Sequence, residues 1–207
     1  MKMVEEQIIP RGVKNKRVLK AMRKVKRDQF VPTTYQGQAY DDNPLPIGYG
    51  QTISQPFIVA SMSELLDPQP QDNILEIGTG SGYQAAILGE IVKEVFTIEI
   101  VEALGKNAQD TLKKLGYKNV HVKIGNGYMG WPEHAPYDGI VVTAAPDHIP
   151  PTLVQQLKPG GKMIIPVGPE GGIQDLMVIT KNKDGEIQSK NLYPVRFVPF
   201  AGGTNHK

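Results

Sequence analysis

The sequence of 207 residues contains no cysteine, a single tryptophan and no long apolar run. Without cysteine, the chain has no disulfide, no thiolate metal ligand and no cysteine nucleophile. No apolar run approaches the roughly 20 residues that a helix needs to cross a bilayer. The first twelve residues carry two glutamates and lack the apolar centre of a secretory signal. We therefore expect a cytoplasmic protein with no membrane association.

The formal net charge is only +2, which by itself does not favour nucleic acid as a partner. Basic residues are nonetheless concentrated in the segment 14–27, where Val18, Leu19 and Met22 recur at helical spacing. Asn15 is the expected N-cap of this helix. We interpret the segment as an amphipathic helix with a solvated basic face. The alternative is a patch that attracts anionic substrates or nucleic acid.

From residue 73 onward, short apolar runs alternate with helical patterns. The apolar runs are typical of strands buried on both faces of a parallel sheet. They lie at 73–77, 95–99, 120–124, 139–143 and 162–167. Helical patterns follow the first, second and fourth of them, at 84–92, 102–115 and 150–157. The alternation predicts βαβ units and an α/β fold with a doubly wound, Rossmann-like sheet.

The C-terminal part of the chain has a different pattern. Two strand-like segments, 176–180 and 187–200, flank a polar turn. In that turn Asp184 and Gly185 readily adopt the positive φ of a tight hairpin. We therefore predict an antiparallel hairpin after the parallel strands.

We expect one domain over residues 1–207. Its N-terminal part, 1–70, combines helical segments with a proline-rich loop and is expected to pack over the active edge of the sheet. Residues 71–170 form the predicted ligand-binding core, and residues 171–207 the hairpin and tail.

The strongest local signal is LEIGTGSGY at 75–83, where a strand ends, three glycines follow and a helix begins. Gly78, Gly80 and Gly82 allow sharp turns and let a ligand approach the backbone, and the helix start offers free N–H groups. Glu99 ends the second strand, 21 residues after Gly78. Nucleotide-binding sheets place an acid there to accept hydrogen bonds from ribose hydroxyls. The simpler alternative for Glu99 is a solvated strand end.

The glycine spacing narrows the ligand. The order is G-x-G-x-G followed by Tyr83, whereas the dinucleotide pattern is G-x-G-x-x-G. A pyrophosphate has to approach the start of the helix closely. The G-x-G-x-G turn of this chain is less suited to a pyrophosphate than the dinucleotide pattern. No phosphate-binding G-x-x-x-x-G-K-[ST] loop is present. The pattern is typical of enzymes that use S-adenosylmethionine (AdoMet), which has a ribose but no phosphate.

With these residues, the chain resembles the protein-L-isoaspartate (D-aspartate) O-methyltransferases, a branch of the class I AdoMet-dependent methyltransferases. The matching segments, in the family's order, are TISQP (52–56), LEIGTGSGY (75–83), TIEI (97–100), GWPEHAPYDGI (130–140), PYDGIVVTAAP (136–146), LKPGGKMIIPVG (157–168) and VRFVPF (195–200). The glycine turn indicates the superfamily, and the pair TISQP and VRFVPF indicates the branch.

The resemblance implies transfer of a methyl group from AdoMet to the free carboxylate of L-isoaspartyl, and some D-aspartyl, residues in damaged proteins. The ester then cyclises to a succinimide that reopens partly to normal aspartate. It also implies that Ser54 is the catalytic serine, which orients the substrate carboxylate. The implied cofactor-binding residues are Gln51, Thr52, Ile53, Ser54, Gly78, Thr79, Gly80, Gly82, Glu99, Asn126 and Gly127. Segments 143–146 and 195–200 are expected to line the peptide cleft.

The chemistry explains why no catalytic base stands out. A carboxylate with an ordinary pKa of about 4 is already ionised at neutral pH, so it needs positioning and desolvation rather than deprotonation. The Ser54 hydroxyl is a suitable hydrogen-bond donor. Its simpler alternative is a cap for a helix beginning near Pro56, and both roles are compatible. The four histidines show no metal-ligand spacing, and no metal is expected.

One departure concerns Asn126 in GNG (125–127), where the family usually has Gly-Asp-Gly. The family's Asp accepts a hydrogen bond from the adenine amino group. An Asn carbonyl accepts the same bond without charge assistance. We therefore expect AdoMet binding to persist, weaker than with Asp.

Two rivals are an RNA or tRNA base methyltransferase that uses the basic helix at 14–27, and a non-catalytic AdoMet-binding scaffold. Adenine amino-methylases carry a different loop after the fourth strand, where this chain has TAAP. Cytosine C5 methylation uses a cysteine. Metal-dependent catechol-type enzymes need several carboxylates where this chain has only Asp147. We expect isoaspartyl proteins and peptides as partners, no nucleic acid, and a monomer.

Overall fold

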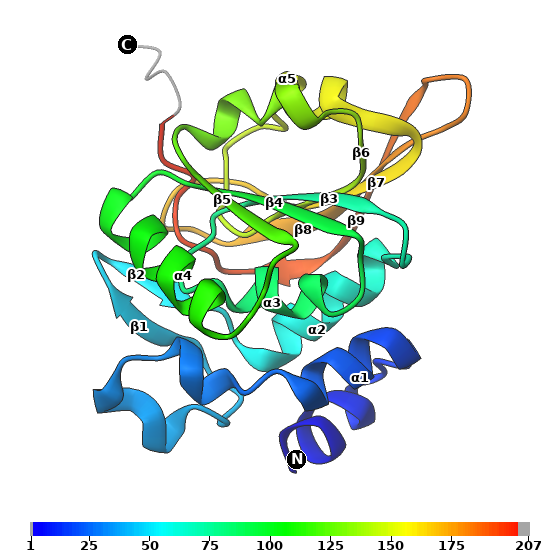
Figure 1. Ribbon diagram of the computed structural model, residues 1–207. Helices are drawn as coiled ribbons and strands as arrows, with labels where there is room; N and C mark the ends of the chain where they lie inside the picture. The colour runs from blue at the N-terminus through cyan, green and yellow to red at the C-terminus, as the bar shows by residue number, and fades with distance from the viewer. Residues whose placement is uncertain (1, 203–207) are drawn as a thin grey trace.

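The computed structural model describes residues 2–202 (Figure 1). Its main sheet has seven strands in the order β5-β4-β3-β6-β7-β8-β9. They are β3 (Asn73–Ile77), β4 (Glu94–Glu99), β5 (Val120–Ile124), β6 (Tyr137–Val142), β7 (Leu157–Val167), β8 (Gln174–Lys181) and β9 (Ile187–Val195). Strands β3 to β7 pair in parallel, and β8 and β9 add antiparallel. The predicted doubly wound sheet and C-terminal hairpin are confirmed.

Five α-helices accompany the sheet within the described part of the chain. They are α1 (Lys16–Lys24), α2 (Pro56–Leu66), α3 (Tyr83–Gly89), α4 (Glu102–Lys114) and α5 (Pro151–Gln156). In Figure 1, α2, α3 and α4 lie on one side of the sheet and α5 on the other, with α1 beneath α2 and α3. Buried apolar side chains form a core on each side. Because both faces are covered there, the central strands β3, β4 and β6 are buried almost throughout, as their sequences predict. The prediction of burial on both faces is wrong for the edge strand β5, which includes His121 and Lys123 and has no fully buried residue.

Strand β7 is longer than predicted, since it begins at Leu157 rather than at residue 162. Its first residues include Gly160 and Gly161. A Cβ on Gly161 would lie 2.7 Å from the Asp138 carbonyl oxygen. Glycine therefore permits the close approach of β7 to β6 at an irregularity in their pairing.

Residues 44–54 form a small hairpin where a proline-rich loop was predicted. Its strands are β1 (Leu45–Gly48) and β2 (Gln51–Ile53). The tip, Gly48-Tyr49-Gly50, has φ values of 93°, 55° and 71°. Two glycines adopt these angles without strain, but strands this short carry no detectable alternation. The hairpin packs across the glycine turn, since a Cβ on Gly80 would lie 3.4 Å from Ile47 Cδ1.

Helix α1 has the predicted cap and face. The Asn15 side chain accepts hydrogen bonds from the backbone N–H groups of Arg17 and Val18. Three of its exposed cations form ion pairs, namely Arg17–Asp67, Arg23–Glu5 and Lys24–Glu90. Exposed pairs of this kind contribute only about 0–1 kcal/mol each. One prediction for this segment is wrong, because Arg27 lies beyond the end of α1 and is completely buried.

Candidate active site

The site lies where the winding of the sheet reverses. After β3 the chain crosses to β4 on one side, whereas after β6 it crosses to β7 on the other. The ends of these strands are tied together, because Gly78 N donates to Ile98 O and Thr143 N to Ile77 O, both at 2.9 Å. Open α/β sheets bind ligands in the crevice at such a switch point.

The three glycines of the turn have different roles. All have positive φ, at 95° for Gly78, 53° for Gly80 and 88° for Gly82. A Cβ on Gly78 would lie 2.5 Å from Thr143 Oγ1, so the turn approaches the end of β6 closely. A Cβ on Gly82 would instead lie 3.2 Å from Leu112 Cδ1. Gly82 therefore allows α3 to pack against α4 and does not line the cavity.

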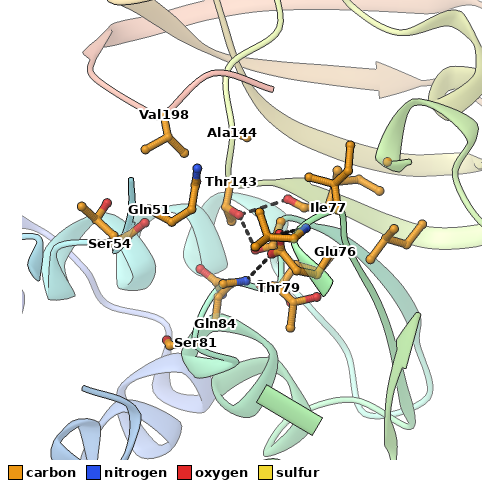
Figure 2. A pocket seen from close by; sticks show the side chains of 18 of the residues that line it. Gln51, Ser54, Glu76, Ile77, Thr79, Ser81, Gln84, Thr143, Ala144 and Val198 are labelled. Atoms are coloured by element: carbon orange, nitrogen blue, oxygen red, sulfur yellow. Dashed lines mark hydrogen bonds between the residues drawn. The ribbon is translucent and has the colours of Figure 1, made fainter. Parts of the chain in front are cut away.

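The cavity over the turn has a volume of about 820 Å³, which includes the solvent at its open mouth. Figure 2 shows Gln51 and Ser54 approaching it from one side, and Glu76 and Thr79 from the other. Thr143 and Ala144 border it at the end of β6. The predicted site residues that line it are Gln51, Thr52, Ile53, Ser54, Gly78, Thr79, Gly80, Glu99 and Gly127. The structure therefore brings most of the predicted site together.

Glu99 is only 6% exposed, so the alternative of a solvated strand end is wrong. Its Oε2 accepts a hydrogen bond from Gly80 N at 2.8 Å, and its Oε1 accepts one from Val101 N at 2.9 Å. These bonds fix the carboxylate in the cavity wall. Each carboxylate oxygen accepts more than one hydrogen bond, so acceptor capacity for a ligand hydroxyl is left.

Ser54 precedes helix α2 but does not cap it. The N-cap is Gln55, and its side chain makes no cap hydrogen bond. The backbone N–H of Phe57 donates instead to Asp42 Oδ1 at 3.0 Å. The capping alternative for Ser54 is therefore wrong. Within residues 2–202, no hydrogen bond involves the Ser54 hydroxyl, whereas its carbonyl accepts from Arg27 Nη1 at 2.8 Å.

A second cavity adjoins the first. It has a volume of about 980 Å³, which includes the solvent at its open mouth. The two cavities share Thr52, Ser54, Thr143 and Val198. The other walls of the second cavity are residues 193–197, the start of α2, and Arg11, Pro44 and Gln55. The predicted cleft residues 195–200 line one cavity or the other. Of segment 143–146, only Thr143 and Ala144 do so, because Ala145 instead pairs with the chain at 198–200.

Asn126 does not line the cavity, although its neighbour Gly127 does. Its Oδ1 accepts from Tyr128 N at 2.9 Å, and its Nδ2 donates to Gly202 O at 2.7 Å. Asn126 therefore caps a short turn and holds the C-terminal segment. Its Oδ1 retains a second lone pair, so the predicted bond to adenine stays a prediction.

Three of the cavity residues that were missed from the sequence carry buried polar groups, namely Glu76, Tyr83 and Gln84. Each has a buried oxygen without a hydrogen-bond partner among the described residues: Glu76 Oε1, Tyr83 Oη and Gln84 Oε1. Buried polar atoms in native proteins are nearly always paired. All three residues line the cavity, so its wall suits a ligand with polar groups, such as AdoMet. The one available signal was a glutamate inside the apolar strand NILEI.

Glu76 is completely buried, and its Oε2 accepts from Thr97 Oγ1 at 2.6 Å. Burial raises the pKa of this carboxyl to about 8, although the Thr97 hydrogen bond acts in the opposite direction. Burial therefore favours the protonated, neutral form of Glu76 at neutral pH. Without a charge, the Glu76 carboxyl is not repelled by Glu99, which lies in the same cavity wall.

We predict that Glu76 makes the ligand-free protein less stable as pH rises. The native state holds its proton up to about pH 8, whereas the unfolded chain loses it near the ordinary value of 4.5. The native state thus binds more protons over this window, so the free energy of unfolding falls between these pH values and then levels off. Glu76→Gln keeps an acceptor for Thr97 and cannot ionise. Thermal unfolding should be measured at pH values from about 5 to about 8. Over this range we expect the melting temperature of Glu76→Gln to rise relative to that of the parent chain. Parallel curves would contradict this.

The histidines make ordinary structural contacts. His121 Nε2 lies 2.7 Å from Glu94 Oε2, His134 stacks on Phe96, and His148 contacts Asp147. His206 lies outside the described residues. Within residues 2–202, no three His, Asp or Glu side chains cluster as metal ligands.

Comparison with known proteins decides the family. The model of the protein-L-isoaspartate(D-aspartate) O-methyltransferase (PCMT) family matches residues 1–205. This chain belongs to that family. A protein-L-isoaspartate O-methyltransferase of Gloeobacter violaceus is 55% identical over 198 residues, which cover 96% of both chains. Protein-L-isoaspartate O-methyltransferase 2 of Syntrophobacter fumaroxidans is 57% identical, over 90% of this chain and 76% of that protein.

Solved structures agree with the sequence comparisons. A Plasmodium falciparum structure described as a protein-L-isoaspartate O-methyltransferase in complex with S-adenosyl-L-homocysteine (AdoHcy) has a TM-score of 0.82, with 27% identity and 96% coverage of both chains. Another protein-L-isoaspartate O-methyltransferase has a TM-score of 0.85 and 30% identity. This chain covers 63% of that longer one. The methyl donor of this family member is AdoMet, and the resemblance inferred from the motifs is confirmed.

Proposed function

We propose that this chain transfers a methyl group from AdoMet to the free carboxylate of L-isoaspartyl, and of D-aspartyl, residues in damaged proteins and peptides. The carrying observation is that two cavities meet at Ser54. One cavity has the glycine turn and Glu99, which suit a nucleoside. The other opens beside residues 193–198 and suits a peptide.

The chain's own residues hold the cofactor in this proposal. The backbone of the glycine turn approaches it, and Glu99 accepts hydrogen bonds from the ribose hydroxyls. Gln51 to Ser54 border the methionine moiety, and the turn at Asn126 and Gly127 borders the adenine. Bound AdoMet supplies a methyl group on a positively charged sulfur.

Ser54 has the central role in positioning the substrate. Its hydroxyl has no partner among the described residues and lines both cavities, so it is free to donate to a carboxylate there. The substrate carboxylate is ionised at neutral pH and needs no base. It must be stripped of water, held by donors and brought to about 3–3.5 Å from the methyl group. Loss of bulk water at the junction strengthens the Ser54 hydrogen bond.

We expect the substrate to bind in the second cavity as an extended peptide. A kinked isoaspartyl residue has to reach from the surface to Ser54, which is easiest when its neighbours lie along the cleft. The cleft contains apolar contacts from Phe57, Ile58 and Phe197 and two cations, Arg11 and Arg196. The methyl ester then cyclises to a succinimide that reopens partly to aspartate, which is protein repair.

Repair is tested by following one isoaspartyl peptide through repeated turnover. With the chain and AdoMet, chromatography should show loss of the isoaspartyl peptide and growth of its normal aspartyl form. Without AdoMet, neither should change on the same timescale. Loss of isoaspartate without any normal aspartate would contradict a repair role.

The rival of RNA methylation rests on the basic helix α1. Arg17, Arg23 and Lys24 are paired with carboxylates, which leaves less free positive charge for phosphates. An RNA substrate would bind with an affinity that falls steeply with salt. Within residues 2–202 no helix is long and apolar enough to cross a bilayer. A cytoplasmic location and a monomeric state stay predictions.

A further inference from the structure

Arg27 is a completely buried cation that contacts no carboxylate through hydrogen bonds. Its guanidinium donates to three backbone carbonyls: Nε to Ala39 O at 2.8 Å, Nη1 to Ser54 O at 2.8 Å and Nη2 to Asn43 O at 3.2 Å. Burial of a charge is costly, and here it lowers the pKa of Arg27 to about 10, with the charge of Asp42 acting in the opposite direction. Three backbone carbonyls, and no carboxylate, therefore accept the hydrogen bonds of this buried cation.

The three carbonyls belong to segments on opposite sides of the β1–β2 hairpin. Ala39 and Asn43 lie in residues 2–44, the N-terminal extension that precedes the β1–β2 hairpin, and Ser54 lies after the hairpin. The guanidinium also lies 5.1 Å from the ring of Tyr83, the first residue of α3 after the glycine turn. Arg27 thus connects the extension to both the Ser54 segment and the cofactor side of the cavity.

Asp42 holds the residues that follow Ser54. Its Oδ1 accepts from Phe57 N, and its Oδ2 accepts from Gln55 Nε2 at 2.7 Å and Arg11 Nη1 at 2.6 Å. The Arg11 guanidinium in turn lies 3.4 Å above the Phe57 ring. The carbonyl of Ser54 and the N–H three residues later are therefore both fixed by side chains of the extension.

We propose that Arg27 and Asp42 are positioning residues that together set the direction of the Ser54 hydroxyl. Arg27 fixes the backbone on the buried side of Ser54, and Asp42 fixes it at the start of α2. The inference rests on the proposed role of Ser54 as the donor to the substrate carboxylate. It assigns the N-terminal extension a part in catalysis through the Ser54 backbone.

Arg27→Lys is the informative variant. A lysine keeps the charge and has three donors, but it lacks the planar fork that reaches three carbonyls in fixed directions. We expect kcat for an isoaspartyl peptide to fall about 10- to 30-fold, since misplacement by about 1 Å can cost 100-fold. AdoHcy affinity should fall by a smaller factor than kcat, because the glycine turn and Glu99 are untouched and only the contact of Arg27 with Tyr83 changes on the cofactor side.

The decisive experiment is a double-mutant cycle of Arg27→Lys with Ser54→Ala. If Arg27 acts through the Ser54 hydroxyl, Arg27→Lys should cost less than about threefold in kcat once that hydroxyl is gone. If the two losses multiply, Arg27 acts elsewhere and the inference is overturned while the role of Ser54 stands. If Ser54→Ala alone keeps full activity, the proposed role of Ser54 fails instead.

Two further variants separate positioning from stability. Leu153→Ala removes a buried side chain of α5 that lines neither cavity, so it should lower the melting temperature without lowering kcat. An equal loss of kcat in Leu153→Ala and Arg27→Lys would overturn the inference. If Arg27→Lys does not fold, Asp42→Asn replaces it in the double-mutant cycle, because Asp42 is less buried than Arg27. Its loss of kcat should be smaller and should also vanish in the Ser54→Ala background, and multiplying losses there would overturn the inference.

Discussion

Replacement of Ser54 by alanine is expected to lower kcat for an isoaspartyl peptide about 100-fold, as loss of one well-placed hydrogen-bond donor does in other enzymes. The hydroxyl contributes no hydrogen bond within residues 2–202, so its removal leaves no internal group unpaired. AdoHcy affinity should change less than about threefold, since Ser54 is one of many residues around the cofactor cavity. Steady-state kinetics and calorimetric titration measure the two quantities.

Ser189→Ala is the matched control for this substitution. Ser189 lies in β9, is exposed and lines neither cavity. This control should retain the parent kcat. Unchanged kcat in Ser54→Ala would contradict a role in orienting the substrate. A parallel loss of AdoHcy affinity would assign Ser54 to cofactor binding instead.

Replacement of Glu99 by alanine is expected to raise the Kd for AdoHcy about 30- to 100-fold. Hydrogen bonds to a charged group contribute about 1.5–3 kcal/mol, and 1.4 kcal/mol corresponds to a factor of ten. The substitution also removes the acceptor for Gly80 N and Val101 N, which loosens the glycine turn. Calorimetric titration of the purified chain with AdoHcy gives the Kd directly.

The same strand provides the control for Glu99. Glu94 begins β4 and forms a partly exposed pair with His121, away from the cavity lining. Glu94→Ala removes a carboxylate from the same strand and should leave the Kd unchanged. An equal Kd for Glu99→Ala and the parent chain would show that the ribose is held by other groups.

The parallel sheet and the cofactor turn were predictable from the sequence because each has a strong local signal. The buried strand β3 is mainly apolar and was predicted to the residue. The bounds of the edge strand β5 were also predicted to the residue, although it alternates apolar residues with His121 and Lys123 and is not buried. The glycine turn and Glu99 have a fixed spacing because the backbone must bend toward a ligand and the next strand must end beside it. These features depend on residues close together in the chain.

The features that position Ser54 were not predictable in this way. Arg27 was counted with a solvated basic face, since charge alone does not reveal that α1 ends at Lys24 and the next turn is buried. The β1–β2 hairpin is too short for a periodic signal. Asp42 contacts residues 13 and 15 positions away, and such contacts follow only from the folded chain. The division of the chain into an N-terminal part (1–70), a ligand-binding core (71–170) and a hairpin with tail (171–207) stays a prediction.

The central claim is tested most directly by methyl transfer from radiolabelled AdoMet to two peptides that differ only in one linkage. One peptide carries an L-isoaspartyl residue, and its twin carries normal L-aspartate at the same position. In the proposed function only the free α-carboxylate of the isoaspartyl residue is held at Ser54, so we expect label in that peptide and none above background in its twin. Equal labelling of both peptides, or of neither, would contradict the proposed function.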